Sequence, residues 1–362
     1  MAEWAWMLCG VAFLAATSGW YLAGLGILSR GSTQLAQAYP PLSIVVAAHN
    51  EAPRLEAFLE SLFDQKYPVF EVVLVLNGCQ DDSLEKAEKW QRKEPRLRLL
   101  NVPEPGKKNA IEAGIRAAQH EVLVFTDADC RPASPFWLRE MAAALRPPFR
   151  GVLGYSPVMP GRGWLNRVAR FDHFSVGIQY LGAAAWGFPY MAVGRNLLYE
   201  RTVFDAVGGF SSHRHLASGD DDLLVQAAAR RFKFQVQWRP ESFVMTEAPV
   251  SWGHFIRRKT RHFTTGRAYR PLPLMLLQAH FLGRLGTWLS PLILFFIGAP
   301  VASCFFFLFF YLLLSVWMWK PLSTKLCEKR LWFHGVWCDA VLTFVHCIAG
   351  ISSLFRNTKR WM

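Results

Sequence analysis

Two aspartates, Asp127 and Asp129, stand directly after the apolar run of residues 122–125. The run predicts a buried β-strand, which places both carboxylates at the carboxyl end of that strand. Mg²⁺ binds carboxylate oxygens together with substrate phosphates, and a bound cation neutralises a diphosphate that leaves during a reaction. We therefore predict a Mg²⁺ or Mn²⁺ site with Asp129 as ligand and Asp127 beside it. An acidic turn without a metal is the alternative explanation.

A second acidic group, Asp220, Asp221 and Asp222, follows Gly219 further along the chain. A carboxylate within about 3 Å of a hydroxyl group removes its proton when that hydroxyl attacks. We predict that this group holds a general base, with Asp221 as the first choice, Asp220 as the second and Asp222 as the third. The alternative is an acidic helix start, where the helix dipole alone favours negative charge.

The elements that must position these carboxylates alternate between strands and helices from residue 42 onward. The apolar runs predict strands at 42–48, 70–76, 97–102 and 122–125, and helices at 50–65, 82–93 and 107–118. This order is typical of an α/β fold with a parallel sheet and helices on both faces. Ligands of such sheets bind at the carboxyl ends of the strands.

The polar residues at those strand ends are therefore predicted to bind a nucleotide-containing donor. They are His49, Asn50, Glu51, Asn77, Lys107 and Asp127. Two of these assignments have plain alternatives: Asn50 and Glu51 also suit a helix cap, and Lys107 with Lys108 suits a solvated helix start. The loop with His213 and His215 has no further ligand nearby, so we expect a polar loop there and no metal.

Three apolar stretches predict membrane helices. Residues 4–28 and 285–319 contain no charged side chain, and residues 331–355 contain only Asp339. Roughly 20 such residues cross a bilayer, and the second stretch is long enough for two helices with a turn near Pro300. Inside a membrane, Asp339 needs either a charged or hydrogen-bonding partner or a helix face that is open to water. We predict an N-terminal membrane helix at 1–30, a catalytic domain at 40–250, a basic amphipathic helix at 250–272 and two to three spans at 280–355.

The basic residues indicate the side of the membrane. The net charge is +13, and much of it lies in two clusters, at 257–270 and 320–330, on either side of the second apolar stretch. Positive charge next to spans marks the cytoplasmic side, so we predict a multi-pass protein of the inner membrane with a cytoplasmic catalytic domain. Arg356, Lys359 and Arg360 conflict with this if the last stretch spans. Because no soluble basic domain exists, nucleic-acid binding is not expected.

These motifs resemble the membrane-embedded family 2 glycosyltransferases with a GT-A fold, the branch of the cellulose, hyaluronan and ceramide glucosyl synthases. The similarity covers about residues 40–265 and is carried by motifs in the family's order. They are residues 45–51, Pro105-Gly106-Lys107-Lys108, Asp127-Ala128-Asp129, Gly194-Arg195-Asn196, Gly208-Gly209-Phe210, Gly219-Asp220-Asp221-Asp222-Leu223 and Arg258-Lys259-Thr260-Arg261-His262. Two positions depart from the family pattern: Asn77 replaces an acidic residue, and His262 replaces a tryptophan.

The resemblance implies an inverting, metal-dependent transfer of a sugar from a nucleotide diphosphate donor, UDP first and GDP second. The acceptor is a lipid, a lipid-linked sugar or a glycan at the membrane, and we favour a single transfer. Arg258 and Arg261 are expected to bind the donor phosphates, since guanidinium matches phosphate oxygens. Gly194, Arg195, Asn196 and His262 are expected near the acceptor. The alternatives are a nucleotidyltransferase on a similar sheet and a non-catalytic membrane subunit that retains the fold.

Overall fold

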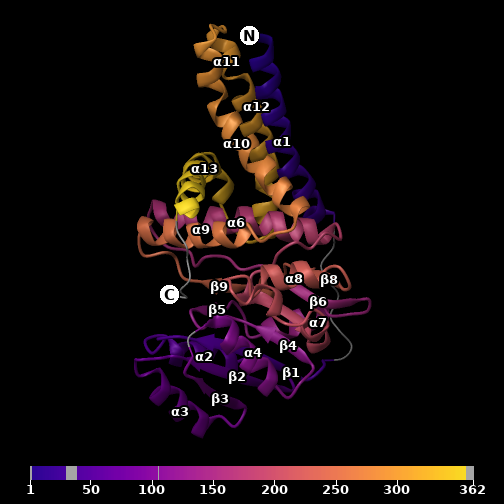
Figure 1. Cartoon of the computed structure of the whole chain (residues 1–362), viewed down its shortest axis with the longest axis vertical. Coiled ribbons are helices and arrows are strands. Elements are labelled where there is room, and N and C mark those ends of the chain that lie inside the picture. The colour runs from indigo at the N-terminus through magenta and orange to yellow at the C-terminus, as the bar shows by residue number, and fades with distance from the viewer. Residues whose placement is uncertain (1, 30–38, 105, 356–362) are drawn as a thin grey trace. The chain divides into compact units, whose positions relative to one another are not determined.

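The computed structural model describes residues 2–29, 39–104 and 106–355. The chain forms two compact units. The α/β unit contains residues 39–159 and 184–248, and the helical unit contains residues 2–29, 160–183 and 249–355 (Figure 1). Pro105 and the basic residues Arg356, Lys359 and Arg360 lie outside the described residues.

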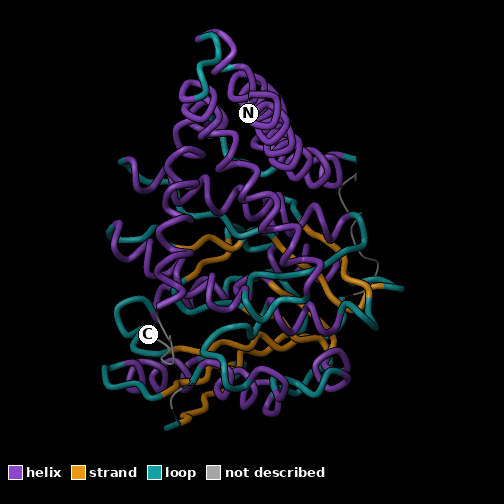
Figure 2. The backbone as a smooth tube through the Cα atoms, turned by 45° about the horizontal axis from the view of Figure 1, so that its top comes forward, coloured by secondary structure: helices purple, strands orange, loops and turns teal. Residues whose placement is uncertain are grey.

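A seven-stranded sheet forms the centre of the α/β unit, in the order β3-β2-β1-β4-β7-β6-β8. Strands β1 to β4 are parallel, β7 is antiparallel to both β4 and β6, and β8 is parallel to β6. Figure 2 shows these strands between layers of helices. The strands are β1 (Leu42–Ala48), β2 (Phe70–Asn77), β3 (Leu97–Val102), β4 (Val122–Phe125), β6 (Phe149–Gly154), β7 (Leu197–Glu200) and β8 (Lys233–Gln237). Strands β5 (Cys130–Pro132) and β9 (Val244–Thr246) form a second, antiparallel pair.

The α/β fold class predicted from the sequence is confirmed. Strands β1, β3 and β4 have the predicted bounds, because each is a short apolar run between polar turns. The connection from β3 to β4 passes back over β2 and β1, so α4 covers the sheet face opposite to α2 and α3. The helices of this unit are α2 (Leu55–Phe63), α3 (Ser83–Lys93), α4 (Lys107–Ala117), α5 (Trp137–Ala144), α7 (Arg201–Ala206) and α8 (Asp222–Ala228).

The first helix of the α/β unit was predicted to start at residue 50, and this start was wrong. Helix α2 begins at Leu55, and Asn50 is not its cap. Asn50 takes a left-handed backbone conformation with φ of 57°, which cannot start a right-handed helix. Its side-chain Oδ1 instead accepts a hydrogen bond from the backbone N–H of Gln80 at 2.7 Å, so Asn50 links the loops that follow β1 and β2.

The helical unit contains three helices that are long and apolar enough to cross a membrane, namely α1, α12 and α13. Helix α10 packs along α1 at very close range: a Cβ on Gly283 would lie 2.6 Å from the backbone N of Ala16. Such contacts between small residues are typical of membrane helices. The helices are α1 (Ala2–Leu28), α6 (Trp164–Ala185), α9 (Trp252–Gly266), α10 (Pro271–Phe296), α11 (Val301–Cys304), α12 (Phe306–Lys325) and α13 (Leu331–Phe355).

Asp339 has the partner that an acidic residue in an apolar helix requires. Its Oδ1 lies 2.5 Å from Nη2 of Arg284 on α10, and its Oδ2 accepts hydrogen bonds from Trp288 and Tyr311 at 2.9 and 3.0 Å. Asp339 is fully buried. The ion pair therefore joins α10, α12 and α13 inside the helical unit.

Candidate active site

Lys107 joins the two acidic motifs of the α/β unit. Its Nζ lies 2.9 Å from Oδ1 of Asp127 and 3.1 Å from Oδ2 of Asp220. Burial by itself lowers the pKa of Lys107, but the charges of Asp127, Asp220 and Asp221 outweigh it and raise the pKa above its usual value. Lys107 is thus a charged group inside the site and not a solvated helix start.

Glycines bring Lys107 to this position at the start of α4. Gly114 lies against the sheet, where a Cβ would be 2.6 Å from Cγ1 of Val45, so a larger residue would push α4 away. Gly106, directly before the helix, has φ of 148°, a conformation that residues with side chains rarely adopt. The Gly-Lys segment of the sequence therefore sets the path of the loop as well as its charge.

Asn77 holds the loop that leads to Lys107. Its side chain is fully buried, its Oδ1 accepts a hydrogen bond from the N–H of Gly106 at 2.7 Å, and its Nδ2 donates to the carbonyl of Glu104 at 2.7 Å. An aspartate could not donate to that carbonyl, which explains why an amide replaces the acidic residue of the family pattern. Asn77 therefore acts on the site through Lys107, and its predicted contact with the donor stays a prediction.

The three aspartates of the acidic triplet have different surroundings. Asp221 caps α8: its Oδ1 accepts from the N–H of Asp222 at 2.8 Å and its Oδ2 from the N–H of Gly194 at 2.7 Å. Burial raises the pKa of Asp221, the charge of Asp220 raises it further, and Lys107 opposes both. Asp220 is ion-paired with Lys107, while Oδ1 of Asp222 accepts from the N–H of Leu223 at 2.9 Å. The capping role and the role as base therefore both fit Asp221.

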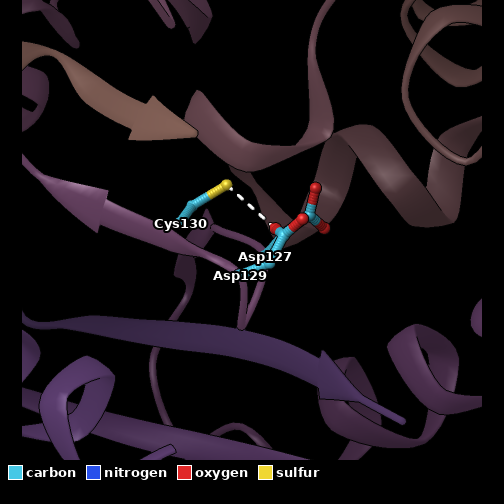
Figure 3. Close-up of side chains that lie close together, drawn as sticks. All are labelled: Asp127, Asp129 and Cys130. Carbon is cyan, nitrogen blue, oxygen red and sulfur yellow. Dashed lines mark hydrogen bonds between the residues drawn. The ribbon is translucent and has the colours of Figure 1, made fainter. Parts of the chain in front are cut away.

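Asp127, Asp129 and Cys130 offer potential metal ligands at the turn after β4. One ligand atom from each lies within 4.8 Å of the others, and Cys130 Sγ donates a hydrogen bond to Oδ1 of Asp129 at 3.1 Å (Figure 3). Asp129 is exposed. Burial, together with the two carboxylates, raises the pKa of Cys130 well above its usual value. A neutral thiol is a poor ligand for Mg²⁺, so the carboxylate oxygens are the groups that fit a hard cation.

The turn after β1 lies on the same edge of the sheet. His49 Nδ1 is 2.6 Å from the carbonyl oxygen of Asn77. Burial raises the pKa of Glu51, and the charge of nearby Asp129 raises it further. Arg54 lies 3.3 Å from Glu51 and 2.9 Å from Glu247, a residue that the sequence reading had not singled out. The structure thus brings Glu51 close to Asp129, while His49 and Asn50 contact the end of β2 and the loop that follows it.

The Gly194-Arg195-Asn196 segment is only partly in the site. The N–H of Gly194 binds Asp221, and a Cβ on Gly194 would lie 3.3 Å from Oδ2 of Asp221, so a small residue suits this position. Arg195 Nε donates to Oγ of Ser156 at 2.6 Å. Asn196 is fully buried and holds the fold, since it accepts from Trp137 Nε1 at 3.0 Å and donates to the carbonyl of Tyr155 at 2.7 Å.

Two further predictions concern residues outside this edge. Arg258, Arg261 and His262 lie on α9 in the helical unit, where Arg258 is hydrogen-bonded to His173 at 2.9 Å. Their contribution to the donor and acceptor sites stays a prediction. In the α/β unit, Lys108 Nζ donates to the backbone carbonyls of His213 and Leu216 at 2.5 and 2.9 Å. The histidine loop is therefore held by its backbone, next to the acidic triplet.

The comparison with known families decides the class of this unit. Residues 43–217 match the family described as Glycosyl transferase family 2. Residues 43–217 carry a family 2 glycosyltransferase domain. The match covers β1 to β4, the Asp127 and Asp129 turn and the Gly194 segment, and it ends just before the acidic triplet.

Individual relatives of this glycosyltransferase domain match over part of their length. The glycosyltransferase AglE of Haloferax volcanii is 27% identical over 185 residues, which are 50% of this chain and 59% of AglE. The uncharacterized glycosyltransferase EpsJ of Bacillus subtilis is 32% identical over 100 residues, which are 28% of this chain and 29% of EpsJ. The chain thus spans less than two thirds of these curated relatives.

A solved structure shares the fold over nearly the whole chain. The mannosyltransferase PcManGT from Pyrobaculum calidifontis, in complex with GDP-Man and Mn2+, matches with a TM-score of 0.62 at 19% identity. The match covers 98% of this chain and 99% of that one. The likeness shows the same fold, the GT-A architecture with apolar helices before and after the α/β unit.

Proposed function

We propose that the protein is an inverting, metal-dependent glycosyltransferase of a membrane. The observation that carries this proposal is the Lys107 bridge, which joins Asp127 to Asp220 beside Asp221. It gathers a cation-binding pair and a candidate base at the carboxyl ends of the strands, where an α/β sheet binds its ligands.

The donor is a nucleotide diphosphate sugar, and the nucleotide is UDP or GDP. The GDP-Man and Mn2+ bound to PcManGT support this donor class and a divalent metal. Asp129 and Asp127 would hold Mg²⁺ or Mn²⁺ through their carboxylate oxygens. When bound, the ion neutralises charge on the diphosphate as the sugar departs. His49, Asn50 and Glu51 line the nucleotide side, and Arg258 and Arg261 add positive charge to the phosphates.

Asp221 removes the proton from the acceptor hydroxyl as it attacks the anomeric carbon. Its raised pKa suits this step, because a base accepts a proton best when its pKa approaches the working pH. The N–H groups of Gly194 and Asp222 fix the carboxylate in one orientation. In-line attack from the side opposite the diphosphate inverts the anomeric centre.

The acceptor is a lipid, a lipid-linked sugar or a glycan presented at the membrane. The three long apolar helices support a membrane protein. The basic clusters around 257–270 and 320–330 support a cytoplasmic position of the catalytic domain at an inner membrane.

Nucleotide release tests this function. The full-length protein in nanodiscs of native lipid is given UDP- and GDP-sugars with Mg²⁺, Mn²⁺ or a chelator. We expect metal-dependent release of UDP or GDP and its loss in Asp129→Asn, whereas the exposed Asp64→Asn variant keeps it. Release of pyrophosphate would indicate a nucleotidyltransferase. Donor binding without any release, with lipid acceptors present, would indicate a non-catalytic subunit.

A further inference from the structure

Helix α13 has the highest hydropathy of the three candidate spans, but it does not run along the direction that α1, α10 and α12 share. In Figure 1, α1, α10 and α12 lie side by side along one direction, with the N-terminus of α1 and the turn at α11 at the same end. Helix α13 is seen nearly end-on near the other end of this bundle, where it packs against α9. It therefore crosses the bundle direction at a steep angle.

One face of α13 is apolar and exposed along its whole length. The large exposed side chains of this face recur every three or four residues, which at about 100° per residue places them in one narrow stripe. They are Phe333, Trp337, Val341, Phe344, Ile348, Ile351 and Phe355. A continuous exposed apolar surface of this length indicates a binding surface.

The opposite face of α13 carries polar residues that bind neighbouring helices. Asp339, His346 and Ser353 are seven residues apart and so share one face. Asp339 pairs with Arg284 of α10, and His346 Nε2 lies 3.5 Å from Oδ1 of Asp172 on α6. Arg267, just after α9, donates to Oγ of Ser353 at 3.2 Å. These three contacts fix the rotation of α13, so the apolar stripe cannot turn inward.

The charges at the two ends of α13 decide between a crossing and an in-plane position. Lys329 and Arg330 precede the helix, and Arg356, Lys359 and Arg360 follow it in the sequence. A crossing helix would place these two basic groups on opposite sides of the membrane, against the enrichment of positive charge on one side. A helix in the membrane plane keeps both groups at the same leaflet.

We infer that α13 is an in-plane membrane helix whose apolar stripe binds the acyl chains of one leaflet. The exposed Lys329 and Arg330, directly before the helix, bind the anionic headgroups of that leaflet. The membrane crossings are then α1, α10 and α12, and α10 is long enough, since 26 residues at about 1.5 Å each exceed the roughly 30 Å of a hydrocarbon core. The inference rests on the proposed membrane placement of α1, α10 and α12 and is independent of sugar transfer.

Reporter fusions on the full-length protein test the side of the C-terminus. Alkaline phosphatase or a fluorescent protein is placed after Met362, in the loop at Gly298, or in the catalytic domain at the exposed Lys93. We expect the C-terminal reporter on the side of the Lys93 reporter and the Gly298 reporter on the other side. A C-terminal reporter on the Gly298 side would show that α13 crosses, which overturns the inference. A Gly298 reporter on the same side as the Lys93 reporter would show that α10 and α12 do not cross the membrane, which also overturns the inference.

The depth of the stripe gives an independent measurement. Spin labels at Phe333→Cys, Phe344→Cys and Ile351→Cys, in a background without other cysteines, are compared with Leu313→Cys on α12 by oxygen and nickel-chelate relaxation. An in-plane helix gives similar depths at the three α13 positions, all shallower than Leu313. A crossing helix gives its greatest depth at Phe344, in the middle of α13, and that profile would overturn the inference. Parental thermal stability confirms that each labelled variant is folded.

Discussion

Two ion-pair clusters, one in each unit, differ in how their charges balance. In the α/β unit Lys107 faces Asp127, Asp220 and Asp221, and the nearby Asp129 is open to solvent. In the helical unit Arg284 pairs with Asp339, and both are buried. An excess of carboxylates that solvent can reach is suited to bind a cation, whereas a balanced, closed pair holds helices together. Substitutions in the two clusters should therefore have different effects, on turnover in the α/β unit and on stability in the helical unit.

The largest expected effect belongs to Asp221→Asn. An amide cannot take a proton, so turnover should fall by about 10²- to 10⁴-fold while donor affinity stays unchanged. The variant keeps one oxygen, which can accept from the N–H of Gly194, and loses the contact with the N–H of Asp222, so the expected loss of stability is confined to the start of α8. Initial rates of nucleotide release and equilibrium donor binding measure the two quantities. If Asp220→Asn loses turnover and Asp221→Asn does not, Asp220 is the base.

Arg284→Met should act on stability instead. Removing one partner leaves Asp339 buried without its cation, which costs about 3–5 kcal/mol in other proteins. Thermal unfolding in nanodiscs should therefore occur at lower temperature, while the rate per folded molecule remains that of the parent. The double variant with Asp339→Leu should recover most of the loss, because no unpaired charge remains. Equal stability of the single variant and the parent would show that this pair is not structural.

The sequence predicted the first half of the sheet better than the second, for a physical reason. Strands β1 and β4 are fully buried apolar runs between polar turns, so periodicity alone locates them. Strands β6 to β8 follow a different order, with β7 inserted antiparallel between β4 and β6, and β7 is only four residues long. Neither the insertion nor the pairing is encoded in local pattern, because long-range contacts decide both.

The candidate site shows the same division between local and long-range information. Asp127, Asp129 and the acidic triplet stand out because carboxylates follow a strand or a glycine. The role of Asn77 was not visible, because it depends on the carbonyl groups of Val102, at the end of β3, and of Glu104, in the loop that follows. The different hydrogen-bond and ion-pair partners of the three aspartates in the triplet were not visible either. They depend on Lys107 and Gly194, which are distant from the triplet in sequence.

Asn77→Asp tests whether this loop carries Lys107. The aspartate loses the donor to the carbonyl of Glu104 and places a carboxylate against it, which should cost about 1–3 kcal/mol of stability. We also expect a higher KM for the donor, because Lys107 moves with the loop. Asn101→Asp, at an exposed position on β3, is the matched control and should change neither quantity. Thermal unfolding and donor titrations measure both, and an unchanged donor KM in the Asn77 variant would contradict the link to Lys107.

The smallest expected effect is a shift of the acid limb of turnover in Asp220→Asn. Burial raises the pKa of Asp221, and the charge of Asp220 raises it further. Asp221 works as a base only when ionised, so turnover falls as the pH drops through this raised pKa. Without the charge of Asp220 the pKa of Asp221 falls, and the acid limb should move to lower pH.

Asp222→Asn is the matched control for this shift, because Asp222 binds the N–H of Leu223 and Asp220 is the carboxylate that raises the pKa of Asp221. Its acid limb should stay at the parental pH in a profile of kcat against pH. The raised pKa of Asp221 also affects the free energy of unfolding. The folded state holds the proton of such a carboxyl more tightly than the unfolded state, so stability falls as the pH rises through the raised pKa. Asp220→Asn lowers the pKa of Asp221 and should therefore lessen this loss of stability. Identical profiles for Asp220→Asn and the parent would show that the excess negative charge around Lys107 does not tune the base. The clusters of the two units would then differ in solvent access alone.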